Sequence, residues 1–305
     1  MDSPADYLPA LQRFLAGSRF AQCGAVMTDL DGTAVHEVEG RAILSPSMEL
    51  GLKQVHDAGR PVIANTLRFP LSVMRVFGAE WQRVTGAPLP LISLKGSQVG
   101  RVVAAASGEL AFEELAAFPL TDAEVGEVME GVRGMVAQGV QELLVFFYPR
   151  DWRQGELIWT PQPERVAPAA QRYRSASQVF TCTLDELEAR LLAQPLCMVF
   201  LLIDAPSDRL MAYQHTDRAR FITHRGVDKR HGAIALADAM DVQLAESVGA
   251  GDAETDTFLS EVGLAVIVGN ANLDFKGRRD TVRVLDPAAF GDMLLATAQA
   301  LGQGL

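Results

Sequence analysis

Residues 26–33 read VMTDLDGT, a short apolar run that ends in two carboxylates, a glycine and a small hydroxyl residue. The apolar run is typical of a buried strand, and the glycine after it is typical of a tight turn. Side chains alternate between the two faces of a strand, so Asp29 and Asp31 can face one pocket while Leu30 packs on the other side. The octet therefore predicts a strand that delivers two acids to one loop.

A second acidic turn, GDAETD, lies far downstream at residues 251–256. Phosphate esters resist hydrolysis because their anionic oxygens repel nucleophiles, so a catalyst has to neutralise that charge and fix the line of attack. Magnesium prefers oxygen ligands, commonly one or two carboxylates together with phosphate oxygens. Asp29, Asp31 and Asp252 offer such oxygens, and the two turns together predict a magnesium-dependent phosphate site.

Four stretches, in this order, resemble the haloacid dehalogenase superfamily of phosphohydrolases, particularly its Cof-like and sugar-phosphatase branch. They are residues 29–33 (DLDGT), 62–68 (VIANTLR), 226–236 (GVDKRHGAIAL) and 251–271, which begins GDAETD and ends IVGNA. The resemblance spans nearly the whole chain from about Ala25 onward. It implies an α/β fold: a Rossmann-like, parallel-sheet core with an α+β cap domain inserted between the second and third stretches.

The resemblance also implies roles for individual residues. Asp29 is expected to be the nucleophile that forms an aspartyl-phosphate, and Asp31 the general acid and base. Thr66 and Lys229 are expected to bind the phosphoryl group, and Lys229 also to neutralise the nucleophile. The expected Mg²⁺ ligands are Asp29, Asp31 through its backbone carbonyl, Asp252 and Asp256, with Asn270 and Arg68 expected in the layer behind them.

Asp256 is the residue of this set whose placement depends on a predicted helix. It follows Asp252 by four residues, and a helix beginning near Glu254 would put it on the face where it binds metal or braces the metal's water shell. Leu67 stands where these relatives commonly have glycine, and Thr255 where they often have asparagine. None of these departures removes an expected catalytic group.

Strand and helix patterns alternate along the chain, which favours a parallel α/β sheet with ligands gathered beyond the carboxyl ends of its strands. The pattern changes between about residues 119 and 217, where capping boxes at Thr121 and Thr183 each predict a helix. The expected strands are 61–65, 89–94, 99–104, 142–148, 196–203, 246–250, 264–268 and 281–285; the expected helices start at 46, 69, 121, 183, 229 and 287. We therefore expect a discontinuous core of residues 1–118 and 220–305, and a cap of residues 119–219.

The composition is that of an ordinary globular enzyme, with 305 residues of which 49% are hydrophobic. A net charge of −11 argues against nucleic acid or an anionic membrane as the main partner, since both attract clustered positive charge. Three widely spaced cysteines match neither a zinc ribbon nor a disulfide framework, and the longest apolar run, residues 196–203, is too short to cross a bilayer. With no secretory signal, we expect a cytoplasmic enzyme; its oligomeric state is not indicated.

These observations predict a magnesium-dependent phosphomonoesterase, a hydrolase acting on a small phosphorylated metabolite such as a sugar or polyol phosphate. One alternative is a phosphomutase of the same superfamily, in which the aspartyl-phosphate passes to a second substrate hydroxyl instead of water. Another alternative is a catalytically idle binding or regulatory protein that keeps the fold. The presence of Asp29, Asp31, Lys229 and Asp252 together favours an enzyme over the idle protein.

Overall fold

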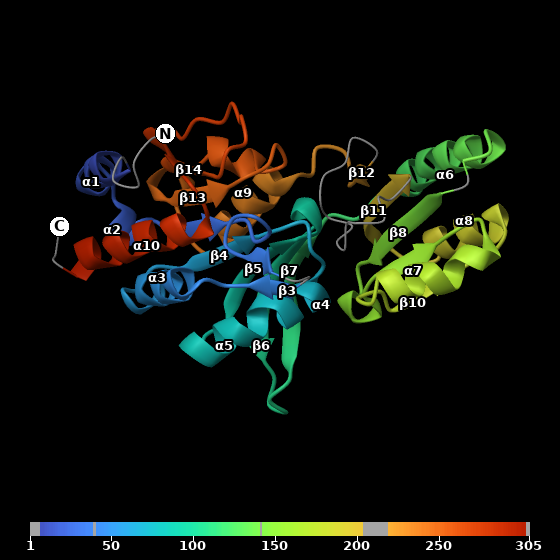
Figure 1. The fold of residues 1–305 in the computed structure, drawn as a ribbon, viewed down its shortest axis with the longest axis horizontal. Coiled ribbons are helices and arrows are strands. Elements are labelled where there is room, and N and C mark those ends of the chain that lie inside the picture. Colours follow the sequence, from blue (N-terminus) through green and yellow to red (C-terminus); the bar gives the residue numbers. More distant parts are fainter. Residues whose placement is uncertain (1–6, 39–40, 141, 204–218, 303–305) are drawn as a thin grey trace. The chain divides into compact units, whose positions relative to one another are not determined.

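A computed structural model of the chain describes residues 7–38, 41–140, 142–203 and 219–302. The contacts within the chain divide it into two compact units. The first unit comprises Met1–Thr66, Met74–Ala116 and Asp228–Leu305, and the second comprises Leu67–Val73 and Ala117–Val227. Each unit is built on a sheet of its own (Figure 1).

The first unit contains an eight-stranded sheet in the order β15-β14-β13-β1-β4-β5-β6-β7. The five neighbouring pairs from β15 to β5 are parallel, and β6 runs antiparallel to β5. The strands are β1 (Val26–Thr28), β4 (Val62–Asn65), β5 (Leu89–Ser93), β6 (Gln98–Ala104), β7 (Leu110–Ala117), β13 (Val248–Gly251), β14 (Leu264–Val268) and β15 (Asp280–Val284). A separate two-stranded hairpin joins β2 (His36–Val38) and β3 (Arg41–Ile43).

The central strands are short apolar runs because both faces of the parallel sheet are covered. Every residue of β1, β4, β13 and β14 is buried. In β1, Val26 pairs with Val248 on one side and with Val62 on the other. The residues that follow β1, β4 and β13 therefore emerge at the same edge of the sheet.

Helices cover this sheet. α3 (Pro46–Asp57) packs along α10 (Pro287–Gly302), α1 (Leu8–Gly17) contacts α10 and β15, and α9 (Lys229–Ala239) packs over β4, β5 and β6. The predicted start of α3 is confirmed, since the Ser45 hydroxyl accepts a hydrogen bond from the Met48 amide ahead of a proline at the first turn. α2 (Phe20–Cys23) is a single turn before β1.

The helix predicted over residues 69–84 is interrupted. It consists of α4 (Pro70–Val73), a π-helical turn (Met74–Gly78) and α5 (Ala79–Thr85), which ends at Gly86 in the left-handed conformation. The sequence does not predict strand β7, because LAFEELAA lacks regular alternation and is rich in alanine, glutamate and leucine, which favour helices.

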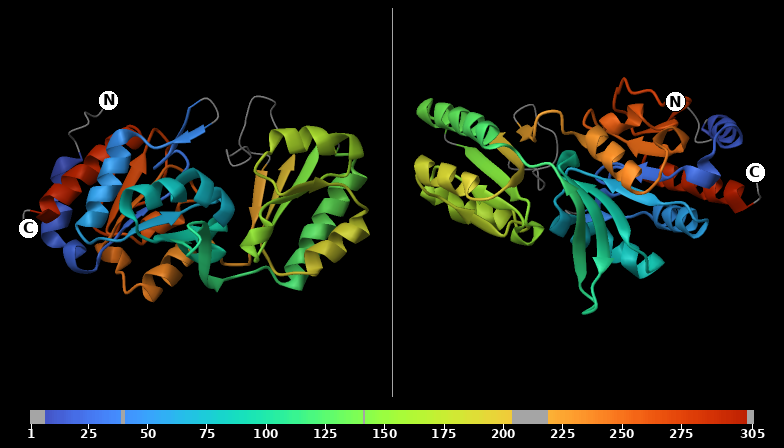
Figure 2. Two further views of the ribbon diagram at one scale, coloured as in Figure 1. Left: turned by 90° about the horizontal axis from the view of Figure 1, so that it is seen from below. Right: turned by 180° about the vertical axis from the view of Figure 1, so that it is seen from behind.

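The second unit has a five-stranded sheet in the order β10-β9-β8-β11-β12. Its strands are β8 (Leu143–Pro149), β9 (Leu157–Trp159), β10 (Gln178–Phe180), β11 (Leu196–Ile203) and β12 (Ala219–Ile222). α6 (Asp122–Ala137) and α8 (Leu184–Leu192) begin with the predicted capping boxes at Thr121 and Thr183. They share a buried apolar cluster with one face of the sheet. A third helix, α7 (Val166–Arg172), precedes β10. Figure 2 shows the strands of this unit side by side, with helices beside them.

None of the helices in the described part of the chain has the length and apolar character needed to cross a bilayer. The parallel core predicted from the alternating pattern is present. The predicted role of residues 119–219 as a cap stays a prediction.

Candidate active site

Two acidic loops leave neighbouring strands at one edge of the first sheet. Asp29 directly follows β1, and its backbone amide donates a hydrogen bond to the carbonyl of Ala250 in β13 at 2.9 Å. Asp252 directly follows β13. Because β1 and β13 are parallel and adjacent, the two carboxylates that follow them lie close together. The two segments are far apart in the sequence: Ala25, just before β1, is 222 residues from Ser247, to whose hydroxyl its amide donates a hydrogen bond.

Lys229 joins this pair from α9, of which it is the first residue. Its ammonium donates to Asp29 Oδ1 at 2.6 Å and to Asp256 Oδ1 at 2.6 Å. The lysine side chain is 1% exposed and that of Asp256 is completely buried. A side-chain charge buried to this degree is tolerated only when it is paired. The Lys229 ammonium therefore depends on the two carboxylates that it contacts.

Asp256 has a place that the sequence did not predict. Its Oδ2 accepts hydrogen bonds from the backbone amides of Asp252 and Ala253, both at 2.9 Å. The helix expected to begin near Glu254 is wrong: residues 252–255 form turns, and a short 3₁₀ helix follows at Thr257–Ser260. By accepting hydrogen bonds from these backbone amides, the Asp256 carboxylate stabilises a turn in place of the predicted helix start.

Asp252 is oriented by the loop that follows β1. The hydroxyl of Thr33, a fully buried residue, donates to Asp252 Oδ1 at 2.9 Å. Gly32, beside it, has a left-handed φ of 82°, and a Cβ at this residue would lie 2.2 Å from Asp252 Oδ2. Only glycine allows both this backbone conformation and this close approach of the carboxylate. Asp31 lies half-buried in the same turn, paired with Val35.

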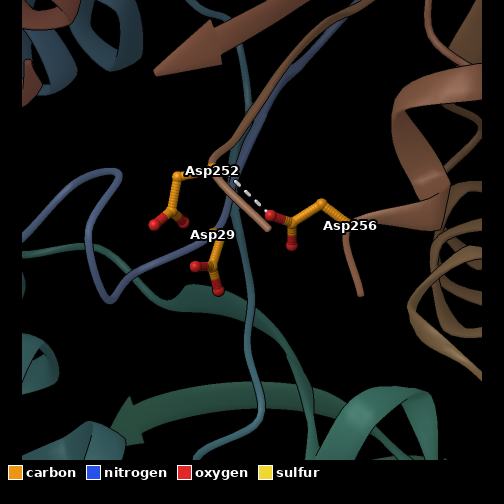
Figure 3. Close-up of side chains that lie close together, drawn as sticks. All are labelled: Asp29, Asp252 and Asp256. Carbon is orange, nitrogen blue, oxygen red and sulfur yellow. Dashed lines mark hydrogen bonds between the residues drawn. The ribbon is translucent and has the colours of Figure 1, made fainter. Parts of the chain in front are cut away.

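Asp29, Asp252 and Asp256 each present a carboxylate oxygen, and the three oxygens lie within 4.8 Å of one another (Figure 3). All donors in the set are oxygens, which suits a hard cation such as Mg²⁺. Asp29 and Asp252 have oxygens free of the hydrogen bonds described above, whereas both oxygens of Asp256 already accept hydrogen bonds. The residues therefore fit Mg²⁺, with Asp29 and Asp252 better placed as direct ligands than Asp256.

Burial and charge crowding set the protonation of the site. Burial raises the pKa of Asp29, and the carboxylates of Asp256, Asp252 and Asp31 add to this, while Lys229 opposes it. Burial, followed by repulsion from Asp256, raises the pKa of Asp252 to about 6. Burial alone lowers the pKa of Lys229, but the attraction of Asp256 and Asp29 outweighs it and raises the pKa, so the ammonium stays charged. A cation at this site relieves the repulsion among the carboxylates.

The remaining predicted site residues lie in different places. Thr66 follows β4 at the same sheet edge and is fully buried, with its amide donating to the carbonyl of Ile92. Arg68 belongs to the second unit, where its guanidinium donates to Ser72 Oγ at 2.9 Å. Asn270 is exposed beyond β14, and within the described ranges no hydrogen bond joins its side chain to Lys229 or Asp252. The roles assigned to these residues stay predictions.

Two side chains that the sequence did not indicate, Asp228 and Thr257, connect α9 by hydrogen bonds to the segment just after the second acidic loop. Asp228 caps α9 by accepting from the His231 amide at 2.8 Å. Its other oxygen accepts from the Thr257 hydroxyl at 2.9 Å, and Thr257 in turn accepts from the Arg230 amide at 3.1 Å. An aspartate one residue before a predicted helix is a recognisable N-cap signal. Nothing in the sequence indicated its second bond to Thr257.

The model of the haloacid dehalogenase-like hydrolase family matches residues 200–283 of the chain. This segment includes Lys229 and Asp252. Over these residues the chain is similar to haloacid dehalogenase-like hydrolases. The predicted resemblance and the expected hydrolase class are thereby confirmed, and no curated protein sequence shows significant similarity to the chain.

Solved structures of haloacid dehalogenase-like proteins share the fold along nearly their whole length. The phosphatase BT1666 from Bacteroides thetaiotaomicron has a TM-score of 0.64 at 18% identity, covering 92% of this chain and 96% of that one. The subclass IIB sugar phosphatase BT4131 has a TM-score of 0.65 at 15% identity, with 91% and 99% covered. A haloacid dehalogenase-like hydrolase from B. subtilis has a TM-score of 0.59 at 19% identity, with 92% and 99% covered. The predicted α/β fold class is confirmed.

Proposed function

We propose that this protein is a magnesium-dependent phosphomonoesterase that hydrolyses a small phosphate ester, such as a sugar or polyol phosphate, through an aspartyl-phosphate on Asp29. The observation that carries the proposal is the buried contact of Asp29 with Lys229, beside Asp252, at the carboxyl edge of the sheet. The solved neighbours include a sugar phosphatase and a member of a phosphoryl-transfer superfamily, which supports this class of reaction.

Each residue has a task in this reaction. Asp29 attacks phosphorus with a carboxylate oxygen, the ester oxygen leaves, and Asp31 protonates it. Asp31 then takes a proton from water, whose oxygen displaces Asp29 from phosphorus and releases inorganic phosphate. Lys229 neutralises charge on Asp29 and the transferring group, and Thr66 donates a hydrogen bond to that group.

Mg²⁺ at this site would neutralise charge on the phosphate oxygens and so favour attack of the Asp29 carboxylate on phosphorus. Asp29, Asp252 and the carbonyl of Asp31 are the proposed ligands. Asp256 is proposed as a brace, because its two oxygens hold Lys229 and the amides of the second loop.

The test is a phosphate-release assay over a broad panel of phosphate esters with Mg²⁺. We expect release that EDTA abolishes and Mg²⁺ restores. The Asp29→Asn variant should fold normally and release no phosphate, whereas Asp31→Asn should still accumulate an acyl phosphate on Asp29, detectable by its cleavage with hydroxylamine.

Three outcomes would contradict the proposal. Near-normal turnover by Asp29→Asn would exclude the nucleophile, and turnover unaffected by EDTA would exclude the metal. Interconversion of sugar phosphate isomers without phosphate release would show a phosphomutase instead.

A further inference from the structure

The side chain of Asn65 connects the end of β4 to the first residue of α9. Its Nδ2 donates a hydrogen bond to the backbone carbonyl of Lys229 at 3.0 Å, and the same nitrogen lies 3.5 Å from the sulfur of Met27 in β1. Asn65 is fully buried. One amide group therefore ties the backbone of the site lysine to the two central strands of the sheet.

The orientation of this amide is fixed by its partner. A carbonyl only accepts, so the nitrogen end of Asn65 must face Lys229. Oδ1 is the other end, and within the described part of the chain it is buried with no hydrogen-bond partner. Leaving a buried acceptor unpaired opposes folding, and an apolar side chain of similar volume would avoid that cost. The hydrogen bond that Asn65 donates to the Lys229 carbonyl therefore explains why an asparagine stands at this position.

The bond fixes the base of a long, flexible side chain. Lys229 reaches Asp29 through four methylene groups, and each of them can rotate. At the backbone of Lys229, Asp228 caps the helix from one side and Asn65 holds the carbonyl from the other. Asn65 also precedes Thr66 in the chain, so a single strand end positions both groups predicted to bind phosphate.

We propose that Asn65 is a positioning residue that holds the backbone of Lys229 so that its ammonium stays on the Asp29 carboxylate. This inference rests on the proposed phosphohydrolase function. It assigns Asn65 no contact with substrate: the residue acts through Lys229. Misplacing a catalytic cation slows the reaction of bound substrate more than it weakens substrate binding.

The first test compares Asn65→Ser with Asn65→Ala, two side chains that differ by one hydroxyl. The serine hydroxyl, one bond shorter than the asparagine amide, offers a donor on the side of the Lys229 carbonyl, whereas alanine offers none. We expect alanine to lower kcat by about 10- to 100-fold with KM changed less than threefold, and serine to recover part of the loss. Ser97→Ala is the matched control: Ser97 is fully buried and its Oγ has no partner among the described residues, so kcat should be unchanged.

The second test asks whether the effect passes through Lys229. Binding of vanadate, a mimic of the phosphoryl group in flight, is measured with Mg²⁺ in wild type, Asn65→Leu, Lys229→Met and the double variant. Asn65→Leu should weaken vanadate binding about as much as it lowers kcat, without lowering the thermal midpoint of unfolding. In the Lys229→Met background the same substitution should have no further effect.

Two results would overturn the inference. One is equal kcat for the serine and alanine variants, with both close to wild type. The other is an undiminished effect of Asn65→Leu in the Lys229→Met background, which would show a structural role independent of the lysine. Absence of any Mg²⁺-dependent turnover in wild type would instead refute the proposed function, so the two failures are distinguishable.

Discussion

The hydroxyl of Thr33 donates a hydrogen bond to Asp252 Oδ1 at 2.9 Å and so joins the loop after β1 to the loop after β13. The two residues are 219 positions apart in the chain. Through this bond the first loop orients the Asp252 carboxylate of the second loop. A residue that hydrogen-bonds to a metal ligand in this way fixes the direction of the ligand and raises the affinity for the metal.

Replacing Thr33 by valine, which has nearly the same shape, removes the hydroxyl and leaves Asp252 free to rotate. We expect the affinity for Mg²⁺ to fall by about tenfold or more. Isothermal titration of the metal-free protein with Mg²⁺ measures this directly. Thr33→Ser keeps the donor and should bind Mg²⁺ nearly as well as wild type; equal affinity in the valine variant would show that the bond is dispensable.

Gly32→Ala should inactivate the enzyme because the new Cβ would lie 2.2 Å from Asp252 Oδ2. The carboxylate would have to move, and we expect a loss of kcat/KM of about 100-fold or more. The control is Gly59→Ala, where φ is also positive, at 79°, but no atom lies within 4 Å of the added carbon. That variant should show the backbone strain alone, as a lower thermal midpoint with unchanged kinetics.

Asp256→Asn should destabilise the protein strongly, because an amide cannot neutralise the buried Lys229 ammonium as the Asp256 carboxylate does. Removing one partner of a buried pair costs about 3–5 kcal/mol. The midpoint of urea unfolding measures the loss. Glu113→Gln breaks an exposed pair with Arg101 at 2.7 Å and should cost less than about 1 kcal/mol. A similarly small loss for Asp256→Asn would refute its role as a brace.

The convergence of Asp29 and Asp252 could be predicted because it depends on sheet topology, whereas the place of Lys229 beside them was implied only by the family resemblance. Acids that follow parallel strands emerge at one edge of the sheet, and the resemblance carried by the ordered motifs implied that these acids share one site. Local helix and strand patterns were also informative. Strand β11 has the predicted bounds, Leu196–Ile203, since a continuous apolar run of eight residues has the length of a buried strand and is short for a helix.

Contacts between individual side chains and distant backbone atoms could not be predicted in this way. Asn65 and the Lys229 carbonyl are 164 residues apart, and no local pattern marks either as a partner. The helix predicted near Asp256 is wrong for a related reason: the Asp256 side chain accepts hydrogen bonds from the backbone amides of Asp252 and Ala253, which stabilises a turn instead. In both cases a specific hydrogen bond, and not periodicity, decides the structure.

In the second unit, specific hydrogen bonds to the Glu124 carboxylate make the free energy of unfolding depend on pH. Its Oε2 accepts from the Thr121 amide at 2.8 Å and from His224 Nδ1 at 2.9 Å, and its Oε1 accepts from the Arg225 amide at 2.9 Å. Its side chain is 8% exposed. The carboxylate thus joins the start of α6 to the segment that follows β12.

Burial by itself raises the pKa of Glu124, but the bonds from His224, Thr121 and Arg225 outweigh it and lower the pKa to about 2 from its ordinary 4.5. A lowered pKa stabilises the folded state above the ordinary value, and that stabilisation is lost as the pH falls from 4.5 toward 2. Glu124→Gln should therefore lower the free energy of unfolding by about 2–3 kcal/mol at pH 7, and the difference from wild type should shrink steadily below pH 4.5. Urea unfolding at a series of pH values measures both. Glu127→Gln, one turn along α6 and 57% exposed, should stay within about 0.5 kcal/mol of wild type throughout. A Glu124→Gln deficit that is independent of pH would mean that packing, and not the ionised carboxylate, accounts for the stabilisation.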